Sequence, residues 1–248
     1  FSMIPKKLKK DPLIEVLWEL RFETEPNFAK IIPGILFSRL KNKYSNLVIN
    51  KLPAESIPAE IKEIDPNLRY APSLRIEVMD IPLIWQVGER VFTFNNKKPY
   101  LGWNRFVEEI KFLSGIFEEI NLFKSIEKIS LRYIDLIEKD IFHDLSDLKV
   151  SINIDKWEVK DEKISLLVEK FDGGFKNIIQ VARPMDIVMD NRQISGTIID
   201  IEVELLERGI LFNELINRNI DAMHDKAKEI FFDMILKDSI INKLEPEW

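Results

Sequence analysis

Hydrophobic and polar residues alternate along the segment that follows Pro12, and this alternation predicts a β-strand. The apolar positions are every second residue: Ile14, Val16, Trp18, Leu20 and Phe22. Successive side chains of a strand point to opposite faces, so the segment presents one apolar face and one face rich in charged residues. Leu17 interrupts the polar face, which indicates that part of this face is covered as well.

Apolar residues spaced three and four apart predict three helices. The first runs through Ile32, Leu36, Leu40 and Tyr44, and Pro33-Gly34 either kinks it or marks its start. The second begins near Trp103 and has an apolar stripe of Phe106, Val107, Ile110, Leu113, Phe117 and Ile120. The last runs from about Ile210 toward Lys237, with a stripe of Leu211, Leu215, Met223, Ala227, Ile230, Phe231 and Met234.

Short candidate strands fill the regions between these helices. Before the second helix they are residues 60–64 and 68–70, which are weak candidates, and the stronger 74–79, 83–87 and 90–94. After a strand that opens at Ile126 and a helical turn at 142–148, the candidates are 149–157, 163–169, 177–183, 186–189 and 196–206. Asp172-Gly173-Gly174 and Asp190-Asn191 are the turn signals between some of them.

Two segments of the chain read almost alike. Ile14-Glu leads to Leu20-Arg21-Phe22, and Ile126-Glu leads to Leu131-Arg132-Tyr133. Each segment is followed by a helical pattern, then by short strands and then by a longer helix. We therefore predict an α+β fold made of two pseudo-repeated halves, residues 3–124 and 125–248, each a mainly antiparallel sheet with helices on one face. No linker rich in Gly, Ser or Pro separates the halves, so they are expected to form one compact unit.

Composition narrows the classes of function. The net charge of −6 argues against a general nucleic-acid binder. The absence of cysteine excludes disulfides, thiol catalysis and cysteine-based zinc sites, and it suits a cytoplasmic protein. No run of apolar residues is long enough for a transmembrane helix, and the N-terminal segment lacks the apolar run of a signal peptide.

The acidic residues Asp200, Glu202 and Glu204 lie at alternate positions of one predicted strand. Alternation places all three carboxylates on the same face, where they are candidate ligands for magnesium or manganese in a nuclease or hydrolase. The strand offers no lysine in the position that a restriction-type nuclease uses. The other interpretation is a solvated sheet face whose acids meet Arg or Lys from neighbouring strands.

Histidine is scarce, with only His143 and His224 in the chain. Neither belongs to a zinc-protease motif, and neither a phosphate-binding loop nor a serine-hydrolase elbow is present. His224 lies on the last predicted helix, where it either packs or acts as a ligand or proton carrier whose ring Asp225 or Asp221 orients. We predict no cofactor and no metal.

Candidate binding residues come from the repeat and from the aromatic residues. Arg21 and Arg132 would occupy equivalent outward-facing positions; each either pairs with an acid such as Glu23 or Asp200 or contributes to a binding surface. Trp103, at the start of a predicted helix, is a third candidate for such a surface. The five Trp and sixteen Phe residues are core anchors, the lining of a cavity for a small hydrophobic ligand, or exposed hot spots for a partner.

Motifs spread over nearly the whole chain resemble those of a sporadically distributed prokaryotic family of proteins of about 250 residues. They are Pro12-Leu-Ile-Glu15 before Leu20-Arg21-Phe22, Tyr100-Leu-Gly102-Trp103, Ile129-Ser-Leu131-Arg132-Tyr133, and His224 followed by Phe231. Members of this family lack an established activity, so the resemblance implies no catalytic residues. Its patchy distribution implies a mobile gene, as in defence and toxin–antitoxin loci.

The sequence therefore predicts a non-enzymatic cytoplasmic interaction or accessory protein whose partner is the product of a neighbouring gene. Two alternatives stay open. One is a metal-dependent nuclease or hydrolase that uses Asp200, Glu202 and Glu204, with His224 as a further candidate. The other is a carrier of a small hydrophobic ligand.

Overall fold

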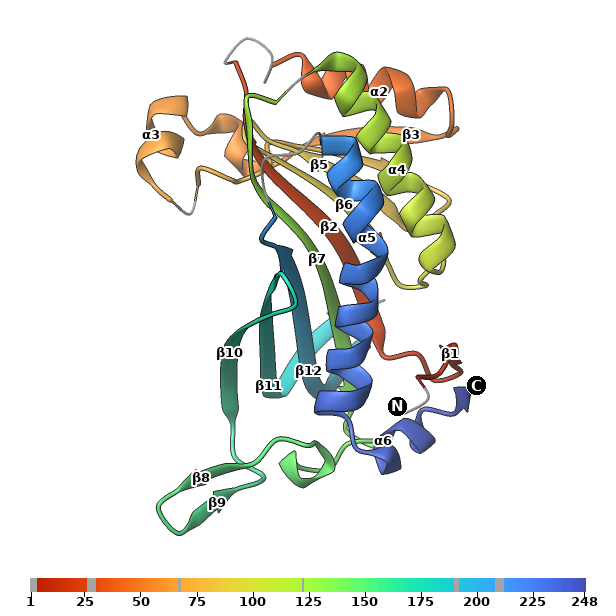
Figure 1. Cartoon of the computed structure of the whole chain (residues 1–248), viewed down its shortest axis with the longest axis vertical. Helices are drawn as coiled ribbons and strands as arrows, with labels where there is room; N and C mark the ends of the chain where they lie inside the picture. Colours follow the sequence, from red (N-terminus) through yellow and green to blue (C-terminus); the bar gives the residue numbers. More distant parts are fainter. Residues whose placement is uncertain (1–3, 26–29, 67, 122, 190–191, 208–211) are drawn as a thin grey trace. The chain divides into compact units, whose positions relative to one another are not determined.

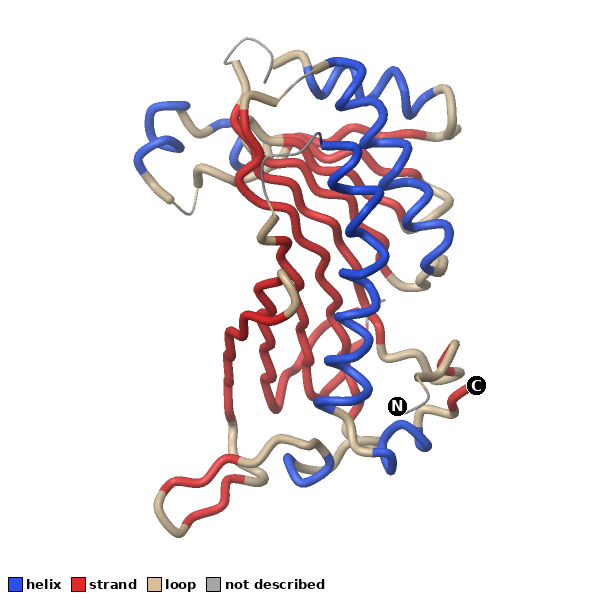
Figure 2. The backbone as a smooth tube through the Cα atoms, viewed as in Figure 1, coloured by secondary structure: helices blue, strands red, loops and turns tan. Residues whose placement is uncertain are grey.

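A computed structural model describes residues 4–25, 30–66, 68–121, 123–189, 192–207 and 212–248. The fold is mixed α+β, as predicted, with a large antiparallel sheet and five α-helices among these residues (Figure 2). The strand order of the large sheet is β10-β11-β12-β7-β2-β6-β5-β4-β3.

The nine strands of this sheet are β2 (Leu13–Glu23), β3 (Leu47–Lys51), β4 (Leu74–Val78), β5 (Leu83–Val87), β6 (Val91–Lys97), β7 (Ser125–Glu138), β10 (Ile164–Asp172), β11 (Phe175–Met189) and β12 (Arg192–Leu205). The helices are α2 (Ile32–Lys41), α3 (Ala59–Ile64), α4 (Trp103–Ile120), α5 (Phe212–Lys228) and α6 (Asp238–Lys243). Two small sheets pair β1 (Lys7–Leu8) with β13 (Pro246–Glu247), and β8 (Ile152–Ile154) with β9 (Trp157–Val159).

The described residues form two compact units that do not coincide with the two predicted halves. The first unit takes residues from 1–14, 132–204 and 222–248, and the second takes residues from 15–131 and 205–221. The chain passes from one unit to the other four times: near the start of β2, in the middle of β7, at the end of β12 and in the middle of α5.

An aromatic core holds the second unit together. The alternation predicted for β2 is confirmed from Val16 on, because Val16, Trp18, Leu20 and Phe22 are all fully buried, whereas Ile14 is half-buried. Helices α2 and α4 cover one face of the strands from β2 to β3 (Figure 1). Beneath α4, the Phe94 ring stacks on Phe106 at 4.7 Å between centroids and on Trp85 at 5.6 Å. Large rings in such contacts supply much of the apolar burial that stabilises a unit of this size.

The first unit contains a tight hairpin of β10 and β11. Nine residue pairs join β10 to β11, from Ile164 opposite Arg183 to Asp172 opposite Phe175. Gly173 and Gly174 form the predicted turn with φ of +60° and +84°, a conformation that glycine adopts without a steric penalty. The C-terminal half of α5 lies along β7 and β12 (Figure 1), and its Met223 and Ala227 are buried.

Four local predictions were wrong. Residues 60–64 form helix α3, and 68–70 form no strand. Residues 149–157 do not form one strand, because the chain reverses at Asp155-Lys156 to give the β8–β9 hairpin. The strands expected at 177–183 and 186–189 are one strand, β11, which continues through Pro184.

The last helix also differs from its prediction. It is α-helical only to Lys228 and continues as a π-helix over Glu229–Ile235. Its expected start near Ile210, the stripe residue Leu211 and the turn at Asp190-Asn191 lie outside the described residues. In the described part of the chain, no helix is long and apolar enough to cross a membrane.

A substitution of Gly196 on β12 tests how closely β12 approaches β7. A Cβ atom at this position would lie 2.4 Å from the carbonyl oxygen of Ile137, which is backbone and cannot move aside cheaply. We expect Gly196→Ala to lower the free energy of unfolding by about 1–3 kcal/mol, measured by urea denaturation. Gly115→Ala is the matched control, because nothing lies within 4 Å of that position in α4. It should be neutral or stabilise by up to about 1 kcal/mol, and equal effects of the two changes would contradict the close packing.

Candidate functional site

The acidic row lies on β12 as predicted, but its first member is already paired. Asp200, Glu202 and Glu204 share one face, and Ile201 and Val203 on the other face are fully buried. Asp200 is almost buried and accepts hydrogen bonds from two nitrogens of Arg132 on β7, with a distance of 2.7 Å from Nε to Oδ1. This bidentate geometry is the strongest form of an arginine–carboxylate pair.

Lysine from the other neighbouring strand faces the rest of the row. Lys176 on β11 donates to Glu169 on β10 at 2.8 Å between Nζ and Oε1. That hydrogen bond, together with the negative charges of Glu169, Glu204 and Glu202, raises the pKa of Lys176. The carboxylates thus meet cations from the strands on both sides. Within the described residues, no group of three or more His, Asp or Glu side chains is arranged to hold a metal ion.

His224 lies on the opposite face of β7 from the acidic row. Its Nδ1 is 2.6 Å from the hydroxyl oxygen of Tyr133, the residue that follows Arg132 on the strand. Neighbouring residues of a strand point to opposite faces, so the sheet separates His224 from Asp200. Asp221, one of the two acids predicted to orient the imidazole, instead accepts a hydrogen bond from Trp103 Nε1 at 2.9 Å. The four residues of the alternative catalytic set therefore do not converge.

Arg21 is engaged within the second unit, although not with the predicted Glu23. Its Nε donates to Glu19 Oε1 at 2.8 Å, and its guanidinium carbon lies 4.5 Å from the centre of the Tyr70 ring. Glu19 also accepts from Lys128 at 3.0 Å. The segment that follows α3 therefore covers the outward face at this position. Among the three predicted binding residues, Arg21, Arg132 and Trp103 all have partners inside the chain.

A buried carboxylate beneath α2 was missed in the sequence. Glu109 on α4 is almost inaccessible, and its Oε2 accepts from Lys43 Nζ and from the Tyr44 hydroxyl, the latter at 2.8 Å. Burial and the charge of Glu109 raise the pKa of Tyr44. The signal was available, since Glu109 lies three residues after Phe106 on the apolar stripe of the helix. Its contacts join α4 to the chain after α2, which is a structural role.

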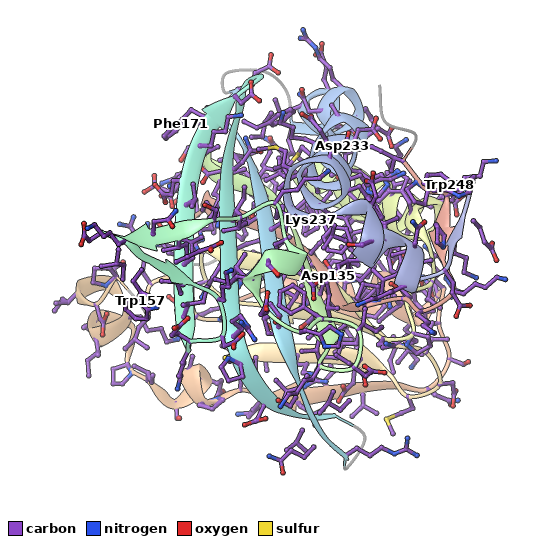
Figure 3. The ribbon with its side chains drawn as sticks, turned by 90° about the horizontal axis from the view of Figure 1, so that it is seen from below. Asp135, Trp157, Phe171, Asp233, Lys237 and Trp248 are labelled. Carbon is purple, nitrogen blue, oxygen red and sulfur yellow. The ribbon has the colours of Figure 1, made fainter. Side chains whose placement is uncertain are left out.

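Apolar side chains are exposed at the tip of the β8–β9 hairpin. Ile154 and Trp157 are opposite each other beside the turn, and 57% and 51% of their surfaces are exposed. Figure 3 shows Trp157 at the periphery of the first unit, away from its packed interior. The indole Nε1 donates to Glu162 Oε1 at 3.1 Å, and Glu162 also accepts from the backbone N–H of Lys160. Backbone hydrogen bonds, with the indole bond added, lower the pKa of Glu162.

Arg183 fixes the chain on both sides of this hairpin. Its guanidinium donates to the carbonyl oxygen of His143 at 2.9 Å and to that of Lys160. The same group lies 5.6 Å from the centre of the buried Phe142 ring. One side chain on β11 thereby anchors the segment that enters the hairpin and the segment that leaves it. The hairpin is therefore anchored at both of its ends.

A scan against protein-family models found no match to this chain, and neither did a search of curated proteins. The resemblance to a sporadically distributed prokaryotic family therefore stays a prediction.

Breaking the Arg132–Asp200 pair tests whether Asp200 is a structural residue. Arg132→Met would leave a nearly buried carboxylate without its partner, at a cost of about 2 kcal/mol of unfolding free energy. The cost is below that of a fully buried pair, because 38% of the Arg132 side chain is exposed. Arg39→Met, which breaks the exposed pair with Glu119, should cost under about 1 kcal/mol. If the two variants lost equal unfolding free energy in denaturant titrations, Asp200 would not be a structural residue and would again be a candidate metal ligand.

The half-buried Tyr44 should make stability depend on alkaline pH. Its pKa is raised in the folded state, so the stability that its neutral form contributes is complete below about pH 10, the usual tyrosine pKa. This stability is lost as the pH rises through the folded-state value. We expect Tyr44→Phe to reduce the loss of unfolding free energy between neutral and alkaline pH. A profile identical to that of the parent chain would show that Tyr44 ionises freely.

Proposed function

We propose that this chain is a non-enzymatic interaction protein that docks a partner through the tip of the β8–β9 hairpin. The observation that carries the proposal is the exposed pair Ile154 and Trp157. Tryptophan is the side chain most enriched at the energetic centres of interfaces, because it buries a large apolar area. Burying the exposed part of this ring against an apolar pocket would remove apolar area from water, which is favourable.

The rigidity of the hairpin supports docking rather than chance exposure. Glu162 holds the indole nitrogen, and Arg183 holds the two ends of the segment. A loop that is already ordered loses less conformational entropy when it binds. The fitting partner is a protein with an apolar pocket wide enough for one indole ring. We infer that it is the product of a neighbouring gene and that both proteins act in the cytoplasm, as in a mobile defence or toxin–antitoxin locus.

The duplication of the chain belongs to the same proposal. Outward from β2 the sheet continues through β6, β5, β4 and β3, and outward from β7 it continues through β12, β11 and β10. Each half therefore has one long strand, then a meander whose last strand returns to pair with it, then a long helix (α4 or α5). The meander has four strands in the first half and three in the second. This mirrored order supports two copies of one module, residues 3–124 and 125–248.

The two alternative functions lack a favouring observation. For a metal-dependent nuclease or hydrolase, Asp200 is bound by Arg132, and His224 lies on the opposite face of the sheet. For a hydrophobic-ligand carrier, the large rings predicted as a cavity lining pack against one another in the second unit. Both functions stay predictions from the sequence.

Co-purification with the product of the adjacent gene tests the docking proposal. We expect a complex with the parent chain, and a loss of about 2 kcal/mol of binding free energy or more in Trp157→Ala, which is roughly thirtyfold in Kd. Trp248→Ala is the matched control, because 55% of the surface of Trp248 is exposed and this residue follows β13, outside the β8–β9 hairpin. Calorimetry or biolayer interferometry measures both variants.

The outcome that counts against docking at the hairpin is an equal affinity of the two tryptophan variants. Absence of a complex with the products of both flanking genes would count against the interaction protein itself. Circular dichroism of Trp157→Ala guards against a folding defect, which is not expected for a half-exposed side chain.

A further inference from the structure

Strand β10 forms an open edge of the large sheet. It occupies the last place in the strand order, and among the described strands it pairs only with β11. Its nine-residue ladder is regular, with neither a bulge nor a proline. Proteins usually block a sheet edge with short strands, prolines, bulges or many charges, because an open edge pairs with any available strand. A long, regular and unblocked edge therefore indicates that β10 pairs with another strand.

The hairpin register shows which backbone groups are available at this edge. A two-residue loop places the flanking residues Asp172 and Phe175 in a hydrogen-bonded pair. From that pair on, every second residue of β10 bonds to β11, and the residues between turn their N–H and C=O groups to the open edge. The outward-bonding residues are Ser165, Leu167, Glu169 and Phe171. Their side chains share one face of the sheet, where Leu167 is 59% and Phe171 is 65% exposed (Figure 3).

The sequence of β10 divides into an apolar half and a charged half. Residues 164–168 carry no charge, and Glu169, Lys170 and Asp172 follow. An antiparallel partner strand with the same sequence would place its charged half against the apolar half of the first. Like charges would then be kept apart, and the aliphatic stems of Lys170 and Glu169 would cover exposed leucines. This charge pattern selects a second copy of the chain over an arbitrary extended segment.

One register of self-pairing uses the whole edge. With Val168 opposite Val168 of the other copy, Ser165 meets Phe171 and Leu167 meets Glu169, so all four outward-bonding residues are paired with one another. Centring on Leu167 leaves Phe171 opposite Lys163, outside the strand. Centring on Glu169 places that carboxylate against itself, which destabilises the pair. Of these three registers, only the one centred on Val168 pairs all four outward-bonding residues and also keeps like charges apart.

We propose that two copies of this chain form a two-fold symmetric dimer by antiparallel pairing of their β10 strands, centred on Val168. The two sheets join into one continuous sheet, and each outward-bonding residue exchanges hydrogen bonds with its partner. The contact is small for a permanent dimer, so we expect a dissociation constant on the order of micromolar. The dimer does not depend on docking at the β8–β9 hairpin, and the two proposals fail separately.

Introduced cysteines test the register, because the chain has none of its own. At the centre of the interface the two Val168 Cα atoms should lie about 4.5 Å apart, within the range that a disulfide spans. Val168→Cys should therefore cross-link into a covalent dimer under mild oxidation. Ser165→Cys, an exposed position on the same strand, is the matched control and should remain monomeric, as should Phe171→Cys. A mixture of these two variants should cross-link, because residues 165 and 171 face each other across the interface.

A charge swap at Leu167 tests the pairing without cysteine. Leu167→Asp places carboxylates against Glu169 at two symmetric positions and should weaken dimerisation about tenfold or more by analytical ultracentrifugation. Leu167→Lys places an ammonium group there and should leave the dimer intact or strengthen it. Both variants change an exposed side chain, so both should fold.

Three results would overturn the dimer. One is cross-linking of Val168→Cys no faster than that of Ser165→Cys. The second is equal weakening by Leu167→Asp and Leu167→Lys, which would indicate a contact through apolar area without this register. The third is a mass that does not depend on concentration in ultracentrifugation of the parent chain, together with no cross-linking of Val168→Cys.

Discussion

The two-residue period of the long central strands is the constraint on which the rest depends. Along β7, Arg132 points to the face where Asp200 lies, and Tyr133 points to the face where His224 lies. A shift of one residue would exchange these two environments and bring the arginine among apolar side chains. The same period buries Leu20 and Phe22 while Arg21 between them meets Glu19. Buried faces thus fix the register, and the register decides which polar residues can meet.

The polar face of each unit is organised as paired charges. In the second unit, Glu19 accepts from both Arg21 and Lys128, and in the first unit Arg132 occupies both oxygens of Asp200. Cations bound to a carboxylate occupy the lone pairs that a metal or a substrate would need. A row of acidic residues on a strand can therefore bind a metal or a substrate only where cations from neighbouring strands do not already pair with it. In this chain the neighbouring strands supply such cations.

The sequence was sufficient where one period extends over a long element. Strand β2, helix α4 and the one-sided acidic row on β12 were predicted correctly, since many residues agree on a single pattern. Helix α3 was missed, because a six-residue window holds too few apolar residues to separate a helix from a strand. The exposure of Trp157 depends on the β8–β9 hairpin leaving the large sheet, which no local pattern encodes. The partner of Arg21 depends on the segment that contains Tyr70, which is distant in sequence.

The two proposed surfaces differ in what they can recognise. An open strand edge offers backbone hydrogen bonds, which every extended peptide can match, so selectivity must come from the order of charges along the strand. In β10 that order favours its own copy. The hairpin tip offers side-chain area instead, and a pocket selects it by shape. One surface selects its partner by the order of charges and the other by shape, so self-association and partner docking can be altered one at a time. In a variant of one surface, the unchanged binding of the other surface serves as the internal control.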